Sequence, residues 1–155
     1  QAVPAPQAAA PAAAQDDAPP RLPDADLVPY GSRVGMNATI VERRGIGTTN
    51  ARVRIIHTEA NAKAFCVEYS SDHSQACVRR TMRGVRLRPE MTANCRTGAF
   101  TGPFGNRFQF RGKRRDGAPE YSIVDVTRRE ELDGSGASGY SEVLEQYAAL
   151  CGRPR

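Results

Sequence analysis

The chain has no closely spaced cysteine pair, few histidines and no long apolar run. Only His57 and His73 could join its scattered cysteines as metal ligands. Structural zinc sites usually combine two close ligand pairs, so the sequence predicts neither a metal nor another cofactor. No apolar segment approaches the length that a membrane-spanning helix needs, and the chain is therefore not expected to be transmembrane.

The cysteines themselves are the most informative residues of the chain. There are four, Cys66, Cys77, Cys95 and Cys151, and an even number of scattered cysteines is typical of disulfide bonds. Four cysteines allow three pairings, of which we favour Cys66–Cys77 with Cys95–Cys151. Disulfides persist in oxidising compartments, so we expect a periplasmic or secreted protein.

The N-terminal segment differs in composition from the rest. Residues 1–28 hold six of the eleven prolines and ten alanines, with almost no large apolar side chain. Such a segment cannot bury enough surface to offset its ordering entropy, so we expect an extended tether or a strip that docks on a partner. Because the chain starts at Gln1 rather than methionine, we expect a mature form from which a signal peptide has been cleaved.

Residues 29–155 are predicted to form a single compact domain made mainly of β-strands. Apolar and polar residues alternate along several short segments separated by turns, which is the pattern of half-buried strands. About seven strands at this spacing suggest a small antiparallel barrel or sandwich. The expected strands cover residues 36–42, 51–57, 64–69, 76–81, 92–100, 107–111 and 120–126.

Two cysteines fall within the expected strands 64–69 and 76–81. Cys66 and Cys77 flank the polar connection Ser70–Gln75. In a hairpin they would lie opposite each other, close enough for a disulfide.

The one expected helix covers residues 139–151 at the C-terminus. Its apolar residues recur at helical spacing, and Gly152 can end it. Such an apolar stripe must pack against another element. A bond between Cys95 and Cys151 would hold this helix against the strand 92–100.

Two motifs resemble functional sites but lack the context that each needs. Gly134–Gly139 reads G-x-G-x-x-G, but the few residues after the helix leave no room for the second strand of a dinucleotide-binding domain. We expect a loop and helix cap there. Asp72, His73 and Ser74 contain the residue types of a catalytic triad, but neighbours in one turn do not converge as a triad does. We therefore predict no catalytic residues.

The charge of the chain is strongly asymmetric. Residues 1–28 carry four acidic groups and one basic group, whereas residues 29–155 carry 21 basic and 13 acidic groups, a net charge of +8. Twenty of the 22 basic residues are arginine, which can make bidentate contacts to carboxylate or phosphate. A GC-rich bacterial genome also favours arginine over lysine. The candidate binding residues are Arg43, Arg44, Arg52, Arg54, Arg79 and Arg80.

These observations favour a non-catalytic exported binding or accessory domain. Its arginine-rich face would engage an acidic protein or an anionic envelope glycan. Nucleic acid is not an expected partner, because no basic helix or aromatic stacking motif is evident. The alternative is an inhibitor of an extracellular hydrolase that inserts a disulfide-braced loop, either Ser70–Gln75 or Thr101–Asn106, into an active site.

The disulfide hypothesis predicts the result of a mass measurement on native protein. Alkylation without prior reduction is expected to leave the intact mass unchanged, because all four cysteines are paired in two disulfides and no thiol is free to react. After reduction, the mass is expected to increase by four alkyl groups. Four reactive thiols in freshly purified native protein, or a bound zinc ion, would contradict the hypothesis.

Overall fold

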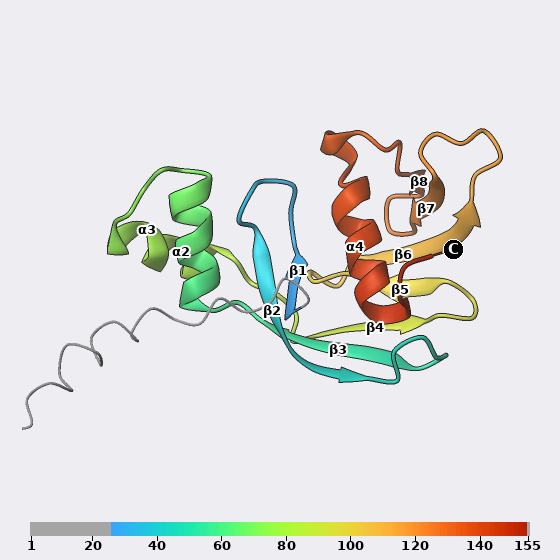
Figure 1. The fold of residues 1–155 in the computed structure, drawn as a ribbon, viewed down its shortest axis with the longest axis horizontal. Helices are drawn as coiled ribbons and strands as arrows, with labels where there is room; N and C mark the ends of the chain where they lie inside the picture. The colour runs from blue at the N-terminus through green and yellow to red at the C-terminus, as the bar shows by residue number, and fades with distance from the viewer. Residues whose placement is uncertain (1–25, 155) are drawn as a thin grey trace, which may run out of the picture.

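The computed structural model describes residues 26–154, and its main element is one eight-stranded antiparallel sheet (Figure 1). Each strand pairs with its neighbours in sequence, so the sheet is a continuous meander. The strands are β1 (Leu27–Pro29), β2 (Asn37–Arg44), β3 (Ala51–Ile56), β4 (Glu90–Asn94), β5 (Ala99–Thr101), β6 (Arg107–Lys113), β7 (Tyr121–Asp125) and β8 (Glu130–Glu131).

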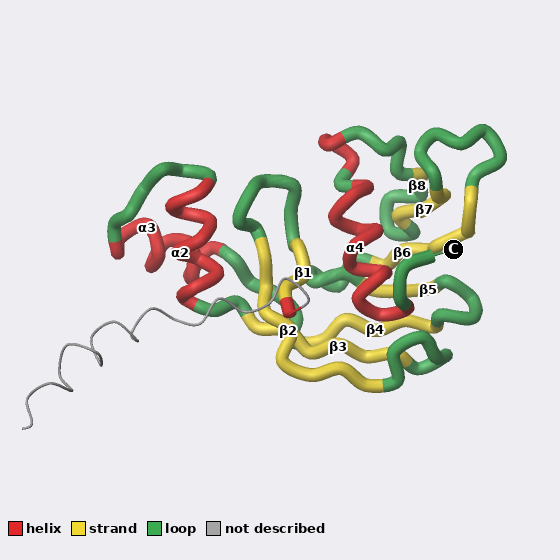
Figure 2. The backbone as a smooth tube through the Cα atoms, viewed as in Figure 1, coloured by secondary structure: helices red, strands yellow, loops and turns green. Residues whose placement is uncertain are grey.

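The helices, all drawn in red in Figure 2, fall into two groups. Helix α4 (Tyr140–Cys151) lies across the sheet and contacts β1, β3 and β4. Helices α2 (Glu59–Glu68) and α3 (Gln75–Gly84) pack against each other beside β2, at one end of the molecule. A short 3-10 helix, η2 (Gly136–Ser138), precedes α4.

The alternation in the sequence places the core side chains. In β3, Ala51, Val53 and Ile55 are buried, while Arg52 and Arg54 are exposed on the other face. In β6, Phe108 is buried beneath α4 in the same core. Since neighbouring side chains of a strand point to opposite faces, one face of the sheet supplies the core and the other faces solvent.

The predicted fold class is confirmed in its main features: a mainly β chain, one C-terminal helix and two disulfides, Cys66–Cys77 and Cys95–Cys151. The words barrel and sandwich are loose, because the strand pairings within residues 26–154 form one sheet that does not close. Leu27 and Val28, at the end of the expected tether, belong to β1. The rest of that segment, residues 1–25, lies outside the described residues.

The hairpin predicted over residues 64–69 and 76–81 is wrong, because both segments are helical. Thr58 begins α2 with a capping box, accepting a hydrogen bond from the Asn61 amide while the Asn61 side chain accepts one from Thr58. Ser74 caps α3 by accepting a hydrogen bond from the Cys77 amide. The disulfide joins two facing helices, with the Cα atoms of Cys66 and Cys77 6.1 Å apart.

The single strand predicted over residues 92–100 is also wrong, since a turn divides it into β4 and β5. The Asn94 side chain accepts hydrogen bonds from the amides of Arg96 and Thr97, which turns the chain back on itself. Gly98 adopts a left-handed φ of 86°, and a side chain there would collide with the Phe110 carbonyl. Only glycine fits this close approach.

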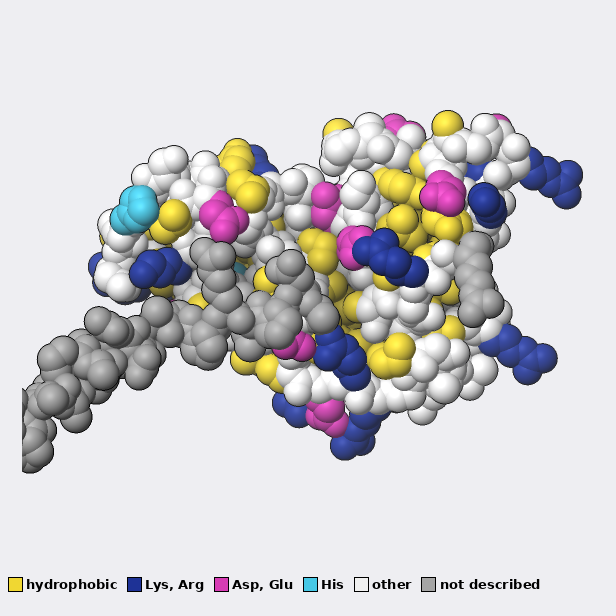
Figure 3. All heavy atoms as spheres, viewed as in Figure 1, with side chains coloured by type: hydrophobic (Ala, Val, Ile, Leu, Met, Phe, Trp, Pro, Cys, Tyr) yellow, Lys and Arg dark blue, Asp and Glu magenta, His cyan; other side chains and the backbone are white. Residues whose placement is uncertain are grey.

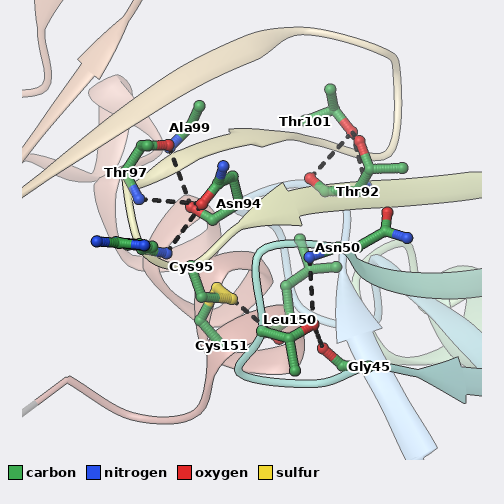
Figure 4. Close-up of a disulfide and its surroundings, with 12 residues drawn as sticks. Gly45, Asn50, Thr92, Asn94, Cys95, Thr97, Ala99, Thr101, Leu150 and Cys151 are labelled. Atoms are coloured by element: carbon green, nitrogen blue, oxygen red, sulfur yellow. Dashed lines mark hydrogen bonds between the residues drawn. A yellow bond between two sulfur atoms is a disulfide. The ribbon is translucent and has the colours of Figure 1, made fainter.

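The second disulfide fastens the end of α4 to this turn (Figure 4). Cys151 is the last residue of α4, and its Cα lies 5.5 Å from that of Cys95. Beside it, the Leu150 carbonyl accepts a hydrogen bond from the Gly47 amide in the β2–β3 connection. The C-terminal end of the helix is therefore tied to two turns of the sheet.

Serine replacement of each cysteine pair is expected to destabilise the protein by different amounts. The Cys95–Cys151 bond closes a loop with a sequence separation of 56 residues, against 11 for Cys66–Cys77. In the chain-entropy model these loops correspond to about 4 and about 3 kcal/mol. Urea unfolding of both double variants tests the order. A larger loss for the Cys66–Cys77 pair would contradict it.

Candidate functional site

The structure divides the six candidate arginines between the sheet and the helical pair. Arg44, Arg52 and Arg54 lie on the outer face of β2 and β3, where Arg44 pairs across the strands with Arg52. Arg43, next to Arg44, lies on the opposite face and forms an ion pair with Asp26 at 3.5 Å. Arg79 and Arg80 lie on α3 (Figure 1), so the predicted single arginine face is two separate groups.

The strand arginines are interleaved with carboxylates. Glu42 accepts from Arg54 at 3.0 Å and from Arg44 at 2.5 Å, and these hydrogen bonds hold the pKa of Glu42 below its ordinary value. Arg52 contacts Glu90 at 2.5 Å. Figure 3 shows the same alternation of blue and magenta side chains along the lower edge of the molecule, over β2 and β3. Three arginines share two carboxylates, so this face has little net charge.

The arginines of α3 are differently placed. Arg79 and Arg83 occupy the side of α3 opposite Cys77 and Val78, Arg80 lies at the edge of that side, and all three are exposed. Arg80 reaches Asp72 at 3.7 Å. Arg79 and Arg83, one helical turn apart, form no ion pair with any of the residues from 26 to 154. We call Arg79, Arg80 and Arg83 the α3 basic ridge.

The first predicted inhibitory loop, Ser70–Gln75, connects α2 to α3 inside the Cys66–Cys77 loop. Asp72 accepts a hydrogen bond from the Ser74 amide, and its contacts with Ser74 lower its pKa. Since Ser74 in turn caps α3, the triad-like Asp72-His73-Ser74 sequence works as a helix start.

The second predicted loop, Thr101–Asn106, contains no cysteine and is held by backbone hydrogen bonds. The Gly102 amide donates to Asn106, and the Arg88 amide donates to Pro103. The loop presents Phe104 with 45% of its surface exposed. Its description as disulfide-braced is therefore wrong.

The glycine-rich segment Gly134–Gly139 forms η2 and the start of α4. Ser135 caps η2, and Gly139 has a left-handed φ of 76° at the first turn of α4. The Glu142 carboxylate lies beside Gly139. A negative charge already occupies the position where the helix dipole would favour a bound anion, which argues against anion binding there.

Neither a metal cluster nor a membrane span is found in the part of the chain that the structure describes. No group of three or more His, Cys, Asp or Glu side chains in this part is placed to hold a metal ion. The sulfurs of Cys66 and Cys77 are bonded to each other in a disulfide, so they are not available as metal ligands. None of the helices here has the length and apolar character needed to cross a bilayer.

The expectation that a histidine at the end of a strand is partly buried, rather than a metal ligand, fits His57, which is half-buried directly after β3. Its ring lies 5.4 Å from the ring of Tyr30, edge to face, and neither ring nitrogen has a hydrogen-bond partner among the described residues. Burial lowers the pKa of His57 and raises that of Tyr30. Tyr30, from the β1–β2 loop, covers the His57 ring.

His57 is expected to make stability depend on pH in the near-neutral range. Its folded pKa lies below the ordinary value of 6.5, so the unfolded chain binds more protons and stability falls as the pH drops from roughly 7.5 to 5.5. His57→Phe is expected to abolish this loss, measured by urea unfolding at several pH values. His73→Gln, at the exposed turn, is the control and should retain it. An unchanged slope in His57→Phe would contradict the assignment.

The comparison with known proteins adds no relative to this picture. No protein-family model matches the chain, and no curated protein sequence or solved structure shows significant similarity to it. The functional conclusion therefore rests on the geometry of the chain itself.

Proposed function

We propose that this protein is an exported, non-catalytic binding domain that engages a polyanionic partner through the α3 basic ridge. The observation that carries the proposal is the pair Arg79 and Arg83. These two exposed arginines lie four residues apart on one helix, without a carboxylate partner in residues 26–154. A ligand rich in carboxylate or phosphate groups supplies the missing partners.

The spacing of Arg79 and Arg83 carries an electrostatic cost, which the position of Arg83 in the last turn of α3 partly offsets. Like charges four residues apart destabilise a helix, whereas the arginines of β2 and β3 are compensated by Glu42 and Glu90. The contrast supports a binding role for α3 rather than for the outer face of β2 and β3.

The ridge is also held in a defined geometry before any partner arrives. Ser74 caps α3, and Cys77 joins it to α2. A surface that is rigid before binding loses less conformational entropy on association. Arginine adds planar, bidentate hydrogen bonding to carboxylates and phosphates. An acidic protein and an anionic envelope glycan both offer this chemistry.

The disulfides support export. Both cysteine pairs are bonded in the structure, and such bonds form and persist in the periplasm or outside the cell. We therefore place the protein in the periplasm or among secreted proteins. It has no catalytic role in this proposal.

The ridge can be tested with two charge-matched double variants. Arg79→Glu with Arg83→Glu is expected to weaken binding to poly-L-glutamate and to polygalacturonate about tenfold, since two contacts become repulsive. Arg96→Glu with Arg111→Glu changes the net charge equally at exposed sites on the β4–β5 turn and β6, and should have a much smaller effect. Affinities are measured by titration at low and high salt. Equal losses of affinity in the two variants would mean that only the net charge of the protein matters, and would contradict the proposal.

The alternative function, inhibition of an extracellular hydrolase, is favoured by one observation. Ser70–Gln75 is a short exposed loop closed by Cys66–Cys77, and Ser71 has a left-handed φ of 51°. Insertion of this loop into a cleft depends mainly on shape, so binding should change little with salt and should be lost on loop mutation. Attraction between exposed charges, in contrast, weakens steeply as ionic strength rises.

A further inference from the structure

A cavity of about 240 Å³ lies near the N-terminal end of α4, away from the α3 basic ridge. Three segments that are distant in sequence form its walls: the start of the β1–β2 loop, the β5–β6 loop, and η2 with the first turns of α4. None of the motifs discussed above assigns a role to this cavity. Its volume suits a small chemical group rather than a whole cofactor.

One wall carries a buried amide oxygen without a hydrogen-bond partner. The Gln146 side chain is only 4% exposed, and its Nε2 donates to the Pro29 carbonyl at 2.9 Å. That bond fixes the orientation of the amide, so Oε1 faces Gly102, where an added methyl group would come within 3.1 Å of it. No donor among the described residues reaches Oε1.

A second unpartnered oxygen lies on the same helix face. Glu142 precedes Gln146 by one turn of α4, lines the same cavity, and has a buried Oε2 that no described residue reaches with a hydrogen bond. The helix dipole favours a carboxylate here, but Glu142 forms no hydrogen bond with any described residue. A buried carboxylate oxygen without a donor is costly.

The buried, unpartnered atoms of this cavity are thus both acceptors. The Ser138 hydroxyl nearby is already engaged, since it donates to the Ser135 carbonyl and accepts from the Tyr140 amide. Guanidinium and ammonium groups carry donors only, whereas sugar hydroxyls carry donors and acceptors together. A cation also offsets the charge of Glu142, which a neutral ligand does not.

Aromatic rings at the mouth suit the same kind of ligand. Tyr30 and Phe104 line the cavity with their rings edge to face at 6.1 Å, and nearly half of the Phe104 surface is exposed. A cation placed over an aromatic face is attracted by the ring quadrupole. The aromatic rings therefore favour a bound cation, as the two acceptor oxygens do.

We propose that this cavity is a binding site for a guanidinium or primary ammonium group, held by Glu142 Oε2 and Gln146 Oε1 and covered by Phe104. The group can belong to a small free cation or to a basic side chain of a peptide. The site is independent of the α3 basic ridge, whose ligands are anionic, so either proposal can fail without the other.

The test uses agmatine and the peptide acetyl-Gly-Arg-Gly-amide as probes, titrated into the full chain and followed by amide NMR shifts and calorimetry. Saturable one-to-one binding is expected, with the largest shifts at the amides of Gly102 and Gly139. Binding of both probes assigns the guanidinium itself as the recognised group, and binding of agmatine alone assigns a free cation.

Glu142→Gln is expected to weaken agmatine binding at least tenfold, because a charge-assisted hydrogen bond is lost. The matched control is Glu145→Gln, the same change at an exposed position of α4 that pairs with Arg153; it should leave binding within about twofold. Phe104→Ala, at an exposed position, should weaken binding several-fold without disturbing the fold, and serves as the readout if Glu142→Gln is unstable.

Three results would overturn the site. The first is the absence of saturable binding of either probe up to about 10 mM. The second is binding that Glu142→Gln and Glu145→Gln reduce equally. The third is binding of N-acetylglucosamine without binding of agmatine, which would make the cavity a sugar site.

Discussion

The packing of α4 on the sheet is the interaction on which the rest of the structure depends. Tyr147 stacks on Phe110 with ring centroids 4.2 Å apart and touches Phe100 at 5.0 Å, and Leu150 is fully buried. Because strands of a meander bury only one face, this helix supplies most of the apolar surface that the sheet needs opposite it. The bond between Cys95 and Cys151 then fixes the end of the helix.

The same packing creates the cavity at the other end of α4. Gln146 is buried because it lies between Val143 and Tyr147 on the face of α4 that meets the sheet, and its amide reaches Pro29 in β1. Buried polar atoms are nearly always hydrogen-bonded. The Gln146 Oε1 is an exception, which a bound hydrogen-bond donor would satisfy. The basic helix α3, in contrast, is supported by its own small core around Cys66 and Cys77. The core between α4 and the sheet supports the cavity with its acceptor oxygens, and the separate core between α2 and α3 supports the α3 basic ridge.

Sequence patterns predicted an element correctly where its buried and exposed faces produce a clear periodicity. The alternation of Val53 and Ile55 with Arg52 and Arg54 places β3 correctly, since period two is a property of the strand itself. The pattern failed at residues 64–69, where alternation over six residues is too short to exclude a helix. There the capping residues Thr58 and Ser74 decide the local structure, and the disulfide was predicted correctly within the wrong element.

The sequence by itself determined the mainly β class and the C-terminal helix, because strand alternation and helical spacing are local properties of the chain. It favoured the correct disulfide pairing among three, but the contacts between the paired cysteines depend on the fold. Only the tertiary structure decided which arginines are neutralised. Glu42 and Glu90 reach Arg54 and Arg52 through strand register, which depends on turns and core packing over the whole sheet. The cavity that contains Gln146 arises in the same way, from three segments that meet only after α4 has packed.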